Sequence, residues 1–63
     1  DAYVTSVKTL YSELLPDYQY LLKSVTEIKE AADAENNYLV SAKMDEFIAS
    51  YAKTIWMLNQ ALL

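Results

Sequence analysis

Cysteine, histidine, arginine and glycine are all absent from this chain of 63 residues. Without cysteine there is no disulfide, and without cysteine and histidine there are no ligands for nearly all zinc, haem and iron–sulfur sites. The same absences remove the thiolate nucleophile and the side chain that transfers protons near neutral pH. A chain without glycine has neither a P-loop nor a Gly-rich dinucleotide turn. We therefore expect no enzymatic activity, no cofactor and no metal.

Positive charge is also scarce. The chain has five lysines and nine acidic residues, so the net charge is −4. Nucleic-acid binding needs a basic surface that releases counterions, and an anionic membrane attracts basic segments, so both partners are disfavoured. The longest charge-free stretch covers residues 54–63, far short of the ~20 apolar residues of a membrane span. No signal peptide is visible, which leaves the compartment open and slightly favours the cytoplasm.

The length allows one small domain, residues 1–63, whose stability as a monomer is marginal. A compact globule of this mass buries about 6,300 Å² on folding. If about 60% of that area is apolar, burial contributes about 95 kcal/mol, and ordering the chain costs about the same. Disulfides, a metal or association can make up the balance in small domains. Only association remains here, and the hydrophobic fraction of 54% agrees with it.

Apolar residues recur with the period of an α-helix in the first half of the chain. They are spaced alternately three and four residues apart, the a/d pattern of packed helices. This stripe contains Val4, Val7, Tyr11, Leu14, Tyr18, Leu21, Val25, Ile28 and Ala32. The opposite face is mostly polar, so a helix over about residues 2–35 is predicted.

Pro16 interrupts this helix and leaves two interpretations open. A proline inside a helix removes the hydrogen bond to the Ser12 carbonyl and bends the helix. A proline also starts helices, so a short first helix ending near Leu14 is the alternative. The heptad phase passes through Pro16 without slipping, and Leu15 before it is no helix cap. These two facts favour a kinked or locally broken continuous helix.

A turn is predicted at residues 35–37, where the chain reads Glu-Asn-Asn. Asn is the best residue for a left-handed helix end in a chain without Gly. The first stripe fails beyond it, because its continuation would place Glu46 among apolar positions. A second stripe of the same spacing takes over and contains Met44, Ile48, Tyr51, Ile55, Leu58 and Leu62. We expect a helix over about residues 38–62, capped by Asn37 or Ser41.

The predicted fold is therefore all-α, an antiparallel helical hairpin whose first helix is kinked or broken at Pro16. A full turn at Pro16 would instead make a compact three-helix bundle. Further apolar residues flank the two stripes. They take positions that are exposed to solvent in a contact of two helices and are covered in a four-helix bundle. We therefore expect two hairpins to pair into a four-helix bundle.

Seven flanking residues are the candidate partner-binding or dimer interface. In the first helix Tyr3 and Leu10 take g positions, and Leu15 and Leu22 take e positions. Phe47, Trp56 and Met57 lie outside the stripe of the second helix. Trp and Tyr are enriched at binding hot spots. For Trp56, self-association, packing inside the hairpin and a foreign partner all stay open.

Tyrosines and carboxylates fit a structural role better than a chemical one. Six tyrosines suit amphipathic packing with each hydroxyl at the rim. Carboxylates occur close together at Glu13 and Asp17, at Glu27 and Glu30, and at Asp45 and Glu46. They come without the histidine of di-iron bundles or a calcium loop. Lysine–acid pairs four residues apart, at 23/27 and 29/33, indicate a solvated face.

The function expected from these features is a non-catalytic protein–protein interaction module. It would act by homodimerisation or by docking on a helical protein partner, as a small regulator, inhibitor or chaperone does. The alternative is a structural subunit or excised helical segment of a larger protein. A ligand-binding helical bundle is a remote third hypothesis.

Overall fold

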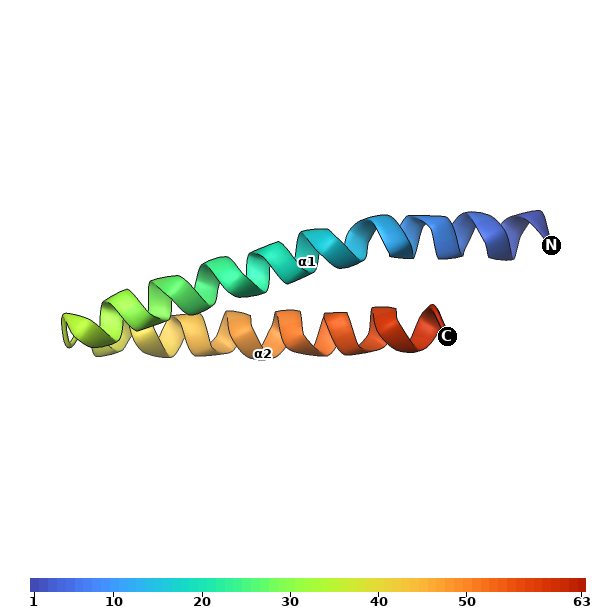
Figure 1. Ribbon diagram of the computed structural model, residues 1–63. Coiled ribbons are helices and arrows are strands. Elements are labelled where there is room, and N and C mark those ends of the chain that lie inside the picture. The colour runs from blue at the N-terminus through green and yellow to red at the C-terminus, as the bar shows by residue number, and fades with distance from the viewer.

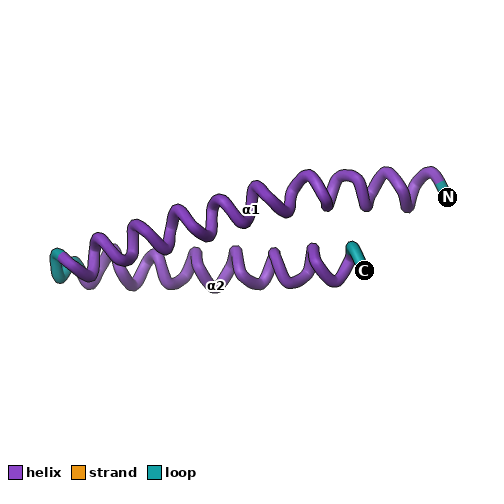
Figure 2. The backbone as a smooth tube through the Cα atoms, in the orientation of Figure 1, coloured by secondary structure: helices purple, strands orange, loops and turns teal.

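The computed structural model describes residues 1–63 and contains two helices, α1 (Ala2–Ala34) and α2 (Tyr38–Ala61). They run antiparallel and side by side, joined by one tight turn, and there is no strand (Figures 1 and 2). The all-α helical hairpin is thus confirmed. The molecule is a rod of 52 × 14 × 14 Å. The N-terminal end of α1 projects beyond the C-terminus of α2 (Figure 1).

Helix α1 begins at a side-chain cap and continues through Pro16. The Asp1 carboxylate accepts a hydrogen bond of 2.9 Å from the Val4 N–H, which satisfies one of the free donors of the first turn. Pro16 lies inside the helix and has no N–H to donate. The helix nevertheless runs as one element, so the structure has two helices and not the three of the alternative bundle. The kink itself stays a prediction.

The turn after α1 is a Schellman motif built around Asn36. Its backbone φ of 58° lies in the left-handed region, as the sequence predicts for this turn. The Asn37 N–H donates to the Ala32 carbonyl at 2.8 Å, and the Asn36 N–H donates to the Asp33 carbonyl at 3.1 Å. These two bonds satisfy carbonyls that the helix end leaves free and reverse the chain within three residues.

Asn37, one of the two caps expected for α2, is the one observed. Its side-chain oxygen accepts from the Val40 N–H at 3.2 Å. Ser41, the other candidate, lies within α2 and is buried. Its hydroxyl is instead 2.8 Å from the Lys29 ammonium nitrogen on α1.

The two helices meet along a seam, the line of side chains that each turns toward the other. All six residues of the predicted α2 stripe lie there, buried or half-buried. The best-buried apolar side chains are Val25, Ala32 and Leu58. Tyr18 packs edge-on against Tyr51, with ring centroids 5.9 Å apart. A hairpin of two helices has no third element to close over this seam, so few of its side chains are fully enclosed.

The predicted α1 stripe follows the seam only in part. Val7 and Leu14 are half-buried, but Leu21 and Ile28 are exposed by 38% and 47%. Leu22 and Lys29 are half-buried in their place. A straight α-helix drifts by about 20° per heptad relative to a strict seven-residue repeat. Over the three heptads from Val7 to Ile28 this drift amounts to about 60°, which carries Leu21 and Ile28 out of the seam.

The left-handed position at Asn36 makes the turn sensitive to substitution. We expect Asn36→Ala to lower the free energy of unfolding by about 1 kcal/mol, because a β-carbon is disfavoured in this region and Asn tolerates it best. Asn36→Gly is expected to raise it by about 0.5–1 kcal/mol. Urea denaturation followed by circular dichroism at one fixed protein concentration measures both. Glu35→Ala is the control, since Glu35 has φ −95° and ψ 2°. If Glu35→Ala and Asn36→Ala changed the free energy of unfolding equally, the left-handed conformation of Asn36 would not be the cause.

Candidate partner-binding surface

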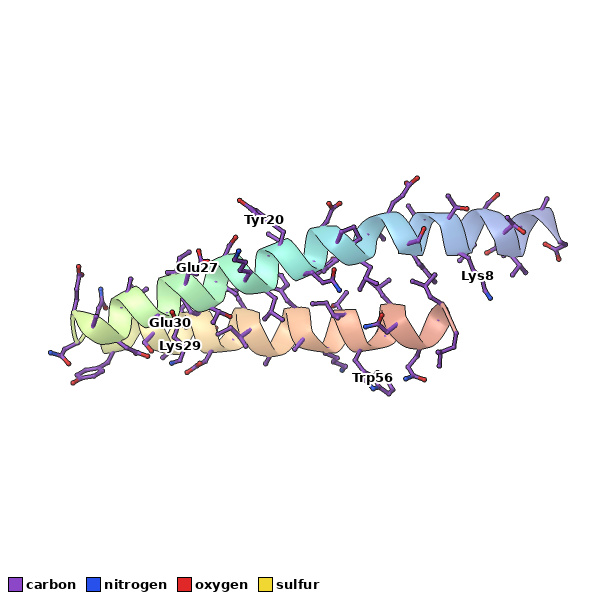
Figure 3. All side chains as sticks on the ribbon, viewed as in Figure 1. Lys8, Tyr20, Glu27, Lys29, Glu30 and Trp56 are labelled. Carbon is purple, nitrogen blue, oxygen red and sulfur yellow. The ribbon has the colours of Figure 1, made fainter.

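A cluster of polar side chains marks one face of the hairpin. The Lys29 ammonium donates hydrogen bonds to Ser41 Oγ at 2.8 Å and to Asp45 Oδ2 at 3.1 Å. It also lies 3.6 Å from Asp33 Oδ2 on its own helix, one of the two expected lysine–acid pairs. Lys29 thereby crosses from α1 to α2, where Figure 3 labels it. These contacts tie the two helices together near the turn and fix which sides of them share a face.

Lys29 is held in its charged form. The hydrogen bond that Lys29 donates to Asp45 raises the pKa of the Lys29 ammonium above its ordinary value of 10.5, and partial desolvation opposes this increase. The negative charges of Asp33 and Asp45 add to the increase. The favourable interaction therefore persists throughout the neutral and mildly alkaline range.

Four exposed apolar residues line the opposite flank of α1. An α-helix has about 3.6 residues per turn, so residues 18 apart are about five turns apart and point the same way. Tyr3 and Leu21 form one such pair, and Leu10 and Ile28 form another. Ile28 precedes Lys29 and points about 100° away from it. Lys29 leans to one side of the seam and Ile28 to the other, so the four residues line the side without the polar cluster.

Phe47 of α2 lies on the same side of the hairpin as these four residues. It stacks on the seam residue Tyr51, with ring centroids 5.9 Å apart and an interplanar angle of 22°. It follows Asp45 by two residues, about 200° around the helix, so Asp45 and Phe47 flank the seam on opposite sides. The Lys43 ammonium lies 5.5 Å from its ring centroid. We call Tyr3, Leu10, Leu21, Ile28 and Phe47 together the apolar face.

A second exposed apolar region covers the side of α2 that is turned away from α1. Trp56 points away from α1 in Figure 3 and is 63% exposed. Met57 is also exposed, and Tyr38 and Leu39 stand 18 residues before Trp56 and Met57. We call these four residues the outer surface of α2. Glu46 and Lys53 lie between its two ends in the sequence, so charge interrupts it midway.

The structure divides the seven residues expected to form an interface into three groups. Leu15 and Leu22 are half-buried, on the side of α1 that turns into the seam. Tyr3, Leu10 and Phe47 lie on the apolar face. Trp56 and Met57 lie on the outer surface of α2, away from α1, so Trp56 is not packed inside the hairpin.

Leu21 and Ile28 are the members of the apolar face that the heptad pattern misassigned. It placed both in the seam, because it assumed that the seven-residue repeat stays in register with the partner helix. A helical projection at about 100° per residue places Leu21 beneath Tyr3 and Ile28 beneath Leu10. The projection of the sequence thus groups these four residues on one side of α1, and the structure shows that this side flanks the seam.

Three further properties of the hairpin bear on ligands. No group of three or more acidic residues gathers where a metal ion could be held. Neither helix combines the length and apolar character needed to cross a bilayer. No pocket opens between the helices or on the surface. The candidate site is therefore an extended surface and not a cavity.

Comparisons with known proteins give two relatives of greater length. The chain is 40% identical over 53 residues to a UPF0182 protein of Clostridium tetani, and this match takes in 84% of the chain and 6% of the relative. It is 33% identical over 55 residues to the DNA protection during starvation protein of Helicobacter pylori, which takes in 87% of the chain and 38% of the relative. The chain thus spans well under half of either protein. No family model matches it, and no solved structure does.

The Lys29 cluster predicts a defined dependence of stability on alkaline pH. A raised pKa in the folded state stabilises the hairpin fully below pH 10.5, and this contribution is lost as the pH rises through the folded value. We expect Lys29→Met to lower Tm at pH 8. The difference from the wild type should shrink above pH 10.5.

Thermal melts from pH 8 to pH 12 measure that difference in Tm, and the subtraction removes every effect of pH that the two proteins share. Lys43→Met is the matched control, because Lys43 pairs with Glu46 at 3.0 Å on an exposed part of α2. Exposed pairs of this kind contribute little, so its Tm should stay near that of the wild type. If Lys29→Met lowers Tm by the same amount at pH 8 and pH 12, the charge interactions of Lys29 with Asp33 and Asp45 are not the cause of the loss.

Proposed function

We propose that this chain is a non-catalytic protein–protein interaction module that packs its exposed apolar residues on other helices, from a second copy or from a helical partner. The observation that carries the proposal is the balance of burial. Four of 63 residues are buried, whereas large apolar side chains stand exposed along the whole rod. Contiguous exposed apolar surface of this extent marks interaction sites in soluble proteins.

The accessible surface supports the same proposal. The chain exposes 4719 Å², whereas a compact monomer of 7.2 kDa exposes about 4,100 Å² by the usual scaling. The surplus of about 600 Å² approaches the ~800 Å² that each partner buries in a standard protein interface. Pairing with two further helices would cover it and complete a four-helix bundle. A kink at Pro16 would serve this role by wrapping α1 around the bundle.

The composition supports a non-catalytic role for the chain. General acid–base and nucleophilic mechanisms near neutral pH rely most often on His and Cys, and this chain has neither. Its carboxylates are paired with lysines or dispersed along the rod.

The relatives favour a second candidate, a structural segment of a longer helical protein. Each match takes in most of this chain and less than half of the relative, as expected for a helical hairpin within a larger molecule. One relative is named for DNA protection during starvation. In this candidate any such activity belongs to the whole protein, since a hairpin of net charge −4 is poorly suited to touching DNA itself.

Light scattering across a dilution series from about 1 mM to 1 μM tests the module hypothesis. We expect a mass above 7.2 kDa at high concentration, together with a Tm that rises with concentration, because association stabilises the folded state by mass action. A strict monomer that melts sharply at every concentration would rule out self-association.

The intact mass of the protein in its source cells separates the two candidate functions. A species of 7.2 kDa supports the module, and a longer polypeptide supports the segment.

A further inference from the structure

One strip along the whole of α1 contains only apolar residues. At about 100° per residue, eight side chains fall within a sector about 60° wide. They are Tyr3, Val7, Leu10, Leu14, Leu21, Val25, Ile28 and Ala32. One edge of the strip packs into the seam, where Val25 and Ala32 are buried. The other edge carries Tyr3, Leu10, Leu21 and Ile28 out to solvent, so the apolar face is continuous with the core of the hairpin.

Each helix contributes to this face, and it lies on the side away from the Lys29 cluster. On that other side, Lys29 donates hydrogen bonds to Ser41 and to Asp45. Burying that side would desolvate charges that water now reaches, at a cost that ion pairs often fail to recover. Burying the apolar face would remove hydrocarbon from water. The two sides of the rod are therefore unequal as docking surfaces.

The outer surface of α2 is a weaker competitor for the same role. Trp56 and Met57 lie near one end of α2, and Tyr38 and Leu39 lie at the other. Glu46 and Lys53 stand between these ends, whereas no charged residue falls within the α1 strip. Depletion of charge at the centre is the feature that distinguishes protein interfaces from other surface.

We propose that the apolar face, formed by Tyr3, Leu10, Leu21, Ile28 and Phe47, binds the same face of a second copy of this chain in a closed two-fold dimer. This inference rests on the proposed interaction function and assigns it a surface and an occupant. The surplus of about 600 Å² over a compact monomer is close to one partner's share of a standard interface, about 800 Å². A single further hairpin supplies two helices, which is what a four-helix bundle needs.

The unequal lengths of the helices also fit a second copy. Helix α1 has 33 residues and α2 has 24, so α1 is longer by about 14 Å at ~1.5 Å per residue. The N-terminal end of α1 projects beyond α2 (Figure 1). Tyr3, the second residue of α1, is 77% exposed. A two-fold dimer places the same patch on both subunits, so one pairing covers both projecting ends.

Paired substitutions on the two competing surfaces test the assignment. In one variant Leu21→Gln is combined with Ile28→Gln, and in the matched control Trp56→Gln is combined with Met57→Gln. All four side chains are exposed, so both variants should keep the helical circular dichroism of the wild type. Sedimentation equilibrium of the three proteins then gives the dimer dissociation constants. We expect the Leu21/Ile28 variant to raise the constant at least tenfold and the control to change it by less than threefold.

Each outcome bears on a different statement. A wild type that stays monomeric up to about 1 mM overturns the second copy as occupant and the self-association part of the proposed function together. A wild type that dimerises, but loses dimerisation in the Trp56/Met57 variant alone, overturns the assignment of the face and leaves the proposed function standing. If the Leu21/Ile28 variant unfolds, Leu10→Gln replaces it, because Leu10 lies near the projecting end. An unchanged dissociation constant for Leu10→Gln with intact helicity then counts against the apolar face.

Discussion

The angular step of the α-helix is the constraint on which this structure depends. Apolar residues repeat every seven positions along α1, whereas about 3.6 residues complete a turn. The stripe therefore rotates slowly around the helix as it runs from Val7 to Ile28. Val7 and Leu14 are half-buried at the seam, whereas Leu21 and Ile28 have moved to the flank. Val25 and Ala32, the other stripe residues near the turn, stay buried in the seam. Two residues of the stripe, Leu21 and Ile28, consequently leave the seam and join the apolar face.

Short-range hydrogen bonds satisfy the helix ends of this hairpin, but much of its apolar surface stays uncovered. Asp1, Asn36 and Asn37 satisfy helix ends within a few residues of themselves. Lys29 joins the helices through Ser41 and Asp45. None of these contacts covers apolar area, and two helices alone cannot enclose a core. The second pair of helices that we propose would cover this area, whether it comes from another copy or from the rest of a longer protein.

The two candidate functions share one physical basis and differ in where the covering helices come from. A self-associating module finds them in solution, so its stability depends on concentration. A segment of a longer protein has them tethered, so the effective concentration is set by the linker. The similarity to a DNA protection during starvation protein over 38% of its length fits the tethered case. The apolar face can pack against covering helices from a second copy or from the same longer chain, because helix packing depends on side-chain shape and not on chain connectivity.

The sequence alone determined the all-α class and the turn at residues 35–37, but it left two helices or three open at Pro16, and the structure shows two. The Asn-Asn pair and the phase break at Glu46 are local signals, and both predicted the turn correctly from neighbours within about two turns of helix. The α2 stripe was also right, because every member from Met44 to Leu62 keeps its place in the seam. Only the tertiary structure decided that Leu21 and Ile28 leave the seam while Leu22 and Lys29 enter it. That choice depends on how far two packed helices wind around each other, which no window of one helix records.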